Sequence, residues 1–165
     1  MNMVRNFIAT ALTTTMLVTA APTLAETMVK EVEVSADLTA VQNAKAGAHW
    51  ATLTADLQNA IVSRIADLIA EDGVKVSVAI DSVELANSLQ SSLGTADSKL
   101  VGQVNISHET DNSKFDSYDL TVTFEQAGPF FVPGTDLTAI TTDSKEYYDA
   151  MIAAFADFVA NKLKG

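Results

Sequence analysis

The chain contains no cysteine, and this absence removes several classes of protein at once. Disulfide frameworks, thiolate metal centres and cysteine nucleophiles are excluded, as is the lipid-accepting cysteine of a bacterial lipoprotein. Positive charge is also scarce, because 10 Lys and Arg stand against 21 Asp and Glu, a formal charge of −11. A chain of this charge repels nucleic acid and anionic lipid, so neither is expected as a partner.

Known catalytic motifs are missing as well. The sequence has no Gly-x-Ser-x-Gly nucleophile elbow, no Ser-x-x-Lys pair, no Gly-x-x-x-x-Gly-Lys phosphate loop and no Gly-x-Gly-x-x-Gly fingerprint. We therefore expect no catalytic, cofactor-binding or metal-ligating residues and no cofactor. Carboxylates are plentiful, so the alternative is a hydrolase with a carboxylate-containing site at the strand ends.

Only two histidines are present, His49 and His108. His49 precedes Trp50, and we interpret it as a helix-entry residue whose ring packs on the indole. His108 opens the polar stretch His108-Glu109-Thr110-Asp111-Asn112, which fits neither a His-Glu-x-x-His site nor an EF-hand loop. A solvated hairpin loop is the preferred interpretation, and a loose calcium site with oxygens from Asp111, Asp116 and Asp119 is the alternative.

The first 25 residues have the anatomy of a secretory signal. Arg5 lies in the short leading segment, residues 7–21 are uncharged and largely apolar, and Pro22 precedes the small residue Ala25. The alternative, a membrane anchor, is disfavoured because six threonines and the proline make the stretch weakly hydrophobic. We predict cleavage before Glu26 and a single α/β domain over residues 26–165. The expected compartment is the periplasm, with the extracellular space as second choice.

Four segments alternate apolar and polar residues with the period of half-buried strands: 28–36, 74–81, 100–107 and 118–125. In the first, Met28, Val32, Val34 and Ala36 are expected to face the core, with Lys30 as an exception. The other three segments have cleaner apolar sets. These sets are Val74, Val76, Val78 and Ile80 in segment 74–81; Leu100, Gly102, Val104 and Ile106 in segment 100–107; and Tyr118, Leu120, Val122 and Phe124 in segment 118–125. Each strand has one polar face, so we predict a sheet that is covered on one side only.

Two segments have the helical period. The first stripe is Trp50, Leu53, Leu57, Ile61, Ile65, Leu68 and Ile69, and the second is Tyr148, Met151, Ile152, Phe155, Phe158, Val159 and Leu163. Gly73 is expected to be a left-handed cap after the first helix. Asp143 and Glu146 have the spacing of a capping box before the second. A weaker helical turn is expected over residues 82–92.

These elements predict an α+β fold, a two-layer sandwich in which two amphipathic helices lie on one face of a four-stranded mixed sheet. The order is β-α-β-β-β-α. The first helix crosses between two parallel strands, and residues 107–117 suit a long hairpin connection.

Four stretches carry a resemblance to known proteins: Val76-Ser77-Val78-Ala79-Ile80-Asp81, Lys99-Leu100-Val101-Gly102, the segment 118–124, and Tyr147-Tyr148-Asp149-Ala150-Met151. Together they resemble uncharacterised exported proteins of alphaproteobacteria, a group whose function is unknown. The element order is also similar, at the level of fold, to small α/β domains of bacterial envelope accessory proteins. Several of those are lipoproteins, and this chain differs by lacking the lipidated cysteine.

One loop stands out between the last strand and the last helix. Gly128-Pro129-Phe130-Phe131-Val132-Pro133-Gly134 places three large apolar residues between two Pro and Gly pairs. We expect Phe130 and Phe131 to close an open end of the core. The alternative is a partner-binding loop formed by Phe130, Phe131 and Val132. The sequence as a whole favours a soluble, non-catalytic periplasmic accessory or binding protein that acts on an unknown envelope partner through a sheet edge or this loop.

Overall fold

The computed structural model describes residues 26–36, 50–84 and 98–165. Four strands form one sheet: β1 (Val29–Ala36), β2 (Val74–Glu84), β3 (Lys99–Ser107) and β4 (Asp116–Thr123). The strand order is β1-β2-β3-β4, with β1 parallel to β2 and the other two pairs antiparallel. This is the predicted four-stranded mixed sheet of an α+β fold.

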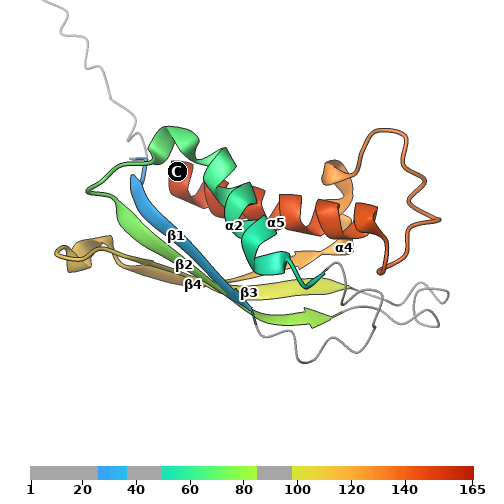
Figure 1. The fold of residues 1–165 in the computed structure, drawn as a ribbon, viewed down its shortest axis with the longest axis horizontal. Helices are drawn as coiled ribbons and strands as arrows, with labels where there is room; N and C mark the ends of the chain where they lie inside the picture. The colour runs from blue at the N-terminus through green and yellow to red at the C-terminus, as the bar shows by residue number, and fades with distance from the viewer. Residues whose placement is uncertain (1–25, 37–49, 85–97) are drawn as a thin grey trace, which may run out of the picture.

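Helices α2 (Leu53–Arg64) and α5 (Lys145–Lys164) cover one face of the sheet (Figure 1). Short helical segments connect the main elements: η1 (Ala66–Leu68), η2 (Asn112–Lys114), α4 (Phe124–Ala127) and η3 (Gly128–Phe130). Helix α2 lies between the parallel strands β1 and β2 in sequence, so the predicted crossover is confirmed. Within the described residues, no helix combines the length and apolar character that a membrane span requires.

Burial confirms the predicted core faces of β2, β3 and both helices. Leu57, Ile61, Ile65, Phe155 and Val159 are fully buried. The apolar sets of β2 and β3 are buried as well. One layer of side chains from the helices therefore meets one face of the sheet, so each amphipathic element buries its apolar face against another.

The predicted core face of β1 is wrong at its start. Met28 is 47% exposed, while Val29, which we expected on the polar face, is fully buried. The pairing of β1 with β2 shifts register between Val29 and Glu31. Such an irregularity inserts one residue and inverts the alternation, so Val29 replaces Met28 in the core and Lys30 turns outward. Beyond the shift, Val32 and Val34 are buried as predicted.

Three predicted helix boundaries are also wrong. The N-cap of α5 is Ser144, whose hydroxyl accepts a hydrogen bond from Tyr147 N–H, so Asp143 is not the cap. Helix α2 ends at Arg64, before the end of the predicted stripe. Ile69 lies beyond the helix, where it is 47% exposed and forms an isolated parallel β-bridge with Val29. The chain has no left-handed residue at Gly73, because the positive φ angles of the described residues occur at Gly134 and Gly165.

Two strand ends also differ from the predictions. Strand β2 continues to Glu84, so the weak helix predicted over residues 82–92 does not begin there, and its remainder lies outside the described residues. Strand β4 ends at Thr123, which caps α4 through a capping box with Gln126, so Phe124 begins a helix instead of ending a strand. His49 also lies outside the described residues.

Candidate functional site

The sheet is covered unevenly by its two helices. The core-facing side chains of the central strands, such as Val76, Val78 and Val104, are fully buried. On the edge strand β4, Tyr118 and Leu120 pack against the core but remain partly exposed. At the other edge, Val32 and Val34 of β1 are buried. The β4 edge is therefore where the apolar interior approaches the surface.

Helix α5 forms the other wall of this region. Lys162 Nζ lies 5.7 Å from the centre of the Tyr118 ring and 3.7 Å from Asp116 Oδ2. Phe158 lies one turn earlier on the same helix face and is also partly buried. We define the β4 seam as Tyr118, Leu120, Phe158 and Lys162.

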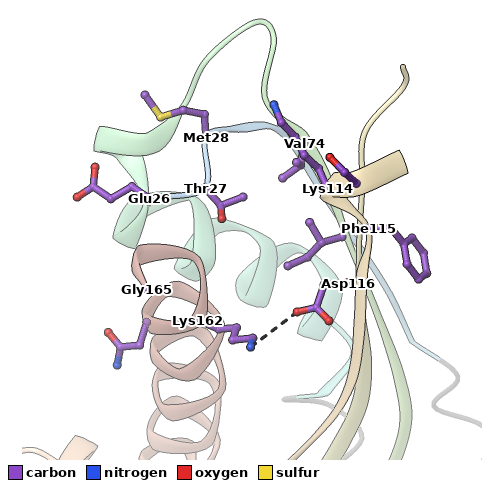
Figure 2. A pocket seen from close by; sticks show the side chains of 12 residues that line it. Glu26, Thr27, Met28, Val74, Lys114, Phe115, Asp116, Lys162 and Gly165 are labelled. Carbon is purple, nitrogen blue, oxygen red and sulfur yellow. Dashed lines mark ion pairs between the residues drawn. The ribbon is translucent and has the colours of Figure 1, made fainter. Parts of the chain in front are cut away.

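A cleft of about 680 Å³ opens at the end of the β4 seam. Its lining comes from the N-terminal segment, the starts of β2 and β4, the end of β3 and the last turn of α5; it includes Thr27, Val74, Ile106, Lys114, Asp116 and Lys162. Figure 2 shows Lys162 reaching from α5 toward Asp116 on the sheet, with Thr27 above them. The N-terminal segment is held here because Thr27 N–H donates to the Leu163 carbonyl at 2.9 Å.

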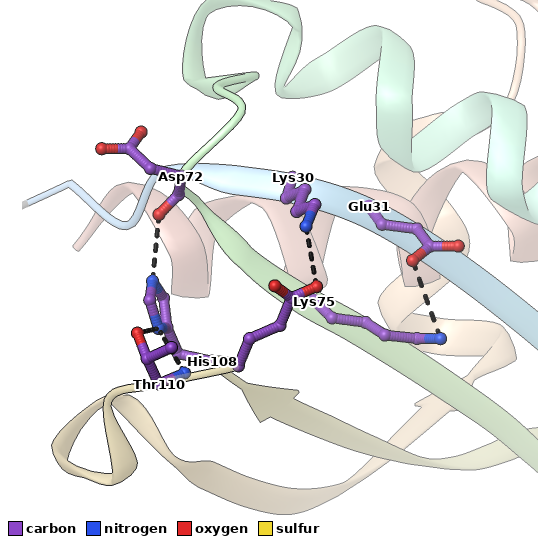
Figure 3. A network of polar contacts seen from close by, with 7 residues as sticks. Lys30, Glu31, Asp72, Lys75, His108 and Thr110 are labelled. Atoms are coloured by element: carbon purple, nitrogen blue, oxygen red, sulfur yellow. Dashed lines mark hydrogen bonds and ion pairs between the residues drawn. The ribbon is translucent and has the colours of Figure 1, made fainter.

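Polar contacts connect the hairpin between β3 and β4 to β1 and to the turn before β2 (Figure 3). Lys30 Nζ lies 2.7 Å from Glu109 Oε1. His108 Nε2 lies 3.0 Å from the Asp72 carbonyl, and Thr110 N–H donates to His108 Nδ1 at 3.3 Å. In this arrangement the carbonyl oxygen of Asp72 accepts from Nε2, and Nδ1 accepts from the Thr110 backbone. His108 therefore has a structural role in the hairpin.

Of the carboxylates considered for a calcium site, Asp111 and Asp116 have other partners, and Asp119 is exposed. Asp111 accepts hydrogen bonds from the backbone and hydroxyl of Ser113, and these bonds lower its pKa. Asp116 faces Lys162. Across the residues that the structure describes, no group of three or more His, Cys, Asp or Glu side chains could hold a metal ion.

The shifted carboxyl groups all favour the ionised form. The hydrogen bond from Lys75 Nζ, and then its charge, lower the pKa of Glu33, and Lys30 lowers that of Glu109 in the same way. Hydrogen bonds from Thr52 and Tyr148 lower the pKa of Asp56. A glycosidase-type general acid needs the opposite shift, a raised pKa that keeps its proton at neutral pH.

Tyr118 has an unusual environment for an edge residue. Burial, followed by the charge of Asp116, raises its pKa to about 12, so the phenol is neutral at physiological pH. The hydroxyl atom is buried and has no hydrogen-bond partner within the described part of the chain. A polar atom in this position loses its water without compensation, which is costly unless another group reaches it.

The Phe130-Phe131-Val132 loop divides between core and surface. Phe131 is 9% exposed and stacks edge-on against Phe124 with ring centres 5.6 Å apart. Phe130 is partly buried against the core. Val132 is 72% exposed. The structure thus places the two aromatic residues inward and leaves Val132 as the large apolar side chain that faces outward.

The apolar set of β4 is predictable from its sequence, but the seam is not. Alternation predicts which face of a strand is apolar, and it does not predict whether a helix covers that face completely. A weak signal was present, because Asp119 lies in the middle of the strand and central charges are typical of edge strands.

Comparisons with known proteins add resemblance in overall shape only. A scan against protein-family models finds no match, and a search of curated proteins finds none either. Among solved structures, the chain is similar to protein XCC0632 from Xanthomonas campestris, of family DUF330, with a TM-score of 0.46 and 13% identity over 83% of this chain and 84% of that chain. It is also similar to a PelC dodecamer from Paraburkholderia phytofirmans, with a TM-score of 0.41 and 10% identity over 82% and 93% of the two chains. A second PelC dodecamer structure from the same organism, which lacks the leucine-to-methionine substitution of the first, gives a TM-score of 0.36 and 15% identity over 84% and 94% of the two chains.

Proposed function

We propose that this chain is an exported, non-catalytic module that binds another protein of the cell envelope along strand β4. The observation that carries the proposal is the β4 seam, where an edge strand and partly exposed apolar side chains lie together. An edge strand offers unpaired backbone donors and acceptors to an incoming strand. A partner strand beside β4 would also cover Tyr118 and Leu120, so backbone pairing and apolar burial would act together.

Export rests on the signal anatomy of residues 1–25. Cleavage before Glu26 would leave a short N-terminal segment that is already fixed to the fold by the Thr27 to Leu163 hydrogen bond. The periplasm is the proposed compartment, and the extracellular space is the second choice. Mass spectrometry of the secreted or periplasmic protein should find Glu26 as the first residue, and an intact chain that keeps residues 1–25 would contradict this part of the proposal.

The second candidate is an envelope hydrolase with a carboxylate site at the strand ends. The end cleft does contain carboxylates, Glu26 and Asp116. However, Asp116 faces Lys162, and the shifted carboxyl groups of the described residues are shifted toward ionisation. These features support binding over acid catalysis.

The loop of Phe130, Phe131 and Val132 stays a second proposed contact surface, now centred on Val132.

Site-specific photo-crosslinking tests the proposal. Thr121 is exposed on β4, and Ser35 is an exposed control on the opposite edge strand β1. A crosslinker at Thr121 should capture one defined protein, and a crosslinker at Ser35 should not. The capture should disappear in Leu120→Lys, which places a charge on the seam, and persist in Ser35→Lys. Equal capture from both edges, or capture that survives Leu120→Lys, would contradict binding along β4.

A further inference from the structure

The two faces of β4 differ in chemistry, and this difference specifies what can pair with it. Tyr118 and Leu120 point toward the core side, and Asp119 between them points to the open face of the sheet. An added strand would lie about 4.8 Å from β4, with side chains of opposed residues on the same face and close enough to touch. Three consecutive partner residues would therefore meet Tyr118, Asp119 and Leu120 in turn.

The core-side positions require apolar partner residues. Tyr118, Leu120 and Phe158 each keep part of their apolar surface exposed. A partner residue opposite Tyr118 or Leu120 would extend the apolar layer beneath α5. A charged residue in either position would have to lose its hydration against this apolar surface, which is unfavourable.

The open-face position requires a basic residue. Asp119 is exposed and makes no ion pair with any residue that the structure describes. The β3 residue opposite it is Gln103, and the two diagonal neighbours on β3 are Val101 and Asn105, so no neighbouring β3 side chain neutralises its charge. A Lys or Arg opposite Asp119 on an added strand would provide the positive charge that neutralises this carboxylate.

A second copy of this chain is a poor occupant. Antiparallel pairing of two β4 strands about Asp119 would place two uncompensated carboxylates opposite each other, and like charges in that position are destabilising. Pairing with β1 would bring Asp119 toward an edge on which Glu31 and Glu33 share Lys75, while the basic residue of that strand, Lys30, is already paired with Glu109. The formal charge of −11 adds general repulsion between copies.

On the basis of the proposed function, we infer that the partner of the β4 seam is an extended protein segment in which a basic residue is flanked on both sides by apolar residues. The basic residue pairs with Asp119, and the apolar residues cover Tyr118 and Leu120. The segment adds a fifth strand to the sheet.

Three synthetic peptides test the inference by fluorescence anisotropy with the purified chain. The first alternates, Thr-Val-Lys-Val-Lys-Val-Thr; the second has Glu in place of Lys; the third has the composition of the first with the lysines and the valines grouped. The alternating basic peptide should bind at least about fivefold more tightly than the grouped one, because the grouped one cannot satisfy both faces of β4 together. Asp119→Asn should weaken the alternating peptide roughly two- to fivefold and leave the acidic peptide unweakened.

The controls separate this inference from the proposed function. Equal binding of the alternating and grouped peptides would mean that net charge alone determines affinity. Tighter binding of the acidic peptide would mean that the edge prefers an acidic partner over a basic one. Either result overturns the inference. If no peptide binds while the Thr121 crosslink persists and Leu120→Lys removes it, the β4 proposal stands and the partner chemistry is wrong. If Leu120→Lys folds normally by circular dichroism and changes neither the crosslink nor peptide binding, both are wrong. A dimer in light scattering that Leu120→Lys disrupts would make a second copy the occupant and overturn the inference.

Discussion

Replacing Gly73 by Ala should disrupt the junction between β1 and β2. A Cβ atom at Gly73 would lie 2.5 Å from Val29 C and 2.6 Å from Lys30 N, where ordinary contacts begin at 3.4 Å. Both obstructing atoms belong to backbone, so no rotamer change can remove the clash. The backbone is also fixed on either side, by Ala70 N–H to Val29 O at 2.9 Å and by Val74 N–H to Met28 O at 2.8 Å. Strand β1 must therefore move away, at the cost of these hydrogen bonds.

The magnitude of the Gly73→Ala effect follows from these contacts. Forcing an extra carbon into a packed site typically costs about 1–3 kcal/mol, and each lost hydrogen bond adds about 1 kcal/mol. The reduced entropy of the unfolded chain offsets about 0.4–1 kcal/mol. We expect a net loss of roughly 2–4 kcal/mol in the free energy of unfolding, measured by urea denaturation.

The matched control is Gly128→Ala. Gly128 has helical angles, and an added Cβ meets no atom within 4 Å outside its two chain neighbours. Because Pro129 follows, helical angles are less favourable for alanine than for glycine at this position, and this offsets the reduced entropy of the unfolded chain. The variant should therefore stay within about 1 kcal/mol of wild type. If the two alanine variants unfold at the same urea concentration, the close approach of Gly73 to β1 is not an energetic constraint and the reasoning fails.

Three further substitutions test the core, the helix contacts and the loop. Phe155→Ala should lower the unfolding free energy by about 3–5 kcal/mol, because the ring is fully buried, and a loss below about 0.5 kcal/mol in urea would place it on the surface. Asp56→Asn should cost about 1 kcal/mol at pH 7, since Thr52 Oγ1 and Tyr148 OH both lie 2.7 Å from its carboxylate. Folding lowers the pKa of Asp56, so its contribution to the free energy of unfolding is present above the unfolded pKa and fades as the pH falls through the folded pKa. In urea melts, the stability difference between Asp56→Asn and wild type should therefore shrink below about pH 4. A difference that stays constant with pH would exclude this linkage. Changing Phe130 and Phe131 together to Ser should clearly lower the melting temperature, because both rings pack against the core. If the melting temperature is unchanged and the protein no longer binds its partner, the binding site lies on this loop.

The faces of the regular elements were predictable because they depend on local periodicity. A helix or strand that packs on one side repeats its apolar residues at a fixed interval, and the sets on β2, β3 and the two helices are buried, apart from Ile69 beyond the end of α2 and the partly buried Phe158. The prediction failed at β1, where the register shift near Glu31 inverts the alternation between Val29 and Val32. A shift in pairing depends on the partner strand, so the pattern within β1 alone carries no record of it.

Helix ends were less predictable, because neighbouring residues offer competing caps. Asp143 and Ser144 are both good N-cap residues, and they differ by a single position. The structure selects Ser144, which lets Tyr147 and Tyr148 point inward to Phe124 and Trp50. Gly73 was assigned to the wrong cause for a related reason: the sequence shows that a glycine follows the helical stripe, and only the fold shows that β1 passes within van der Waals distance of it.

The seam was the least predictable feature, because it arises from strand order and not from any one segment. β3 and β4 both present an apolar face to the helices, yet among the described strands β3 has a neighbour on each side and β4 has a neighbour on one side only. Two helices over four strands leave the last strand partly covered, so its residues Tyr118 and Leu120 keep some exposure, whereas Val122 nearer the end of the strand is fully buried. Asp119 places a charge on the polar face of the same strand, and a charge on an edge strand discourages pairing with chains that cannot neutralise it. The same carboxylate that protects the edge would then select the partner, since a strand with a basic residue in that position gains the ion pair and the apolar contact together.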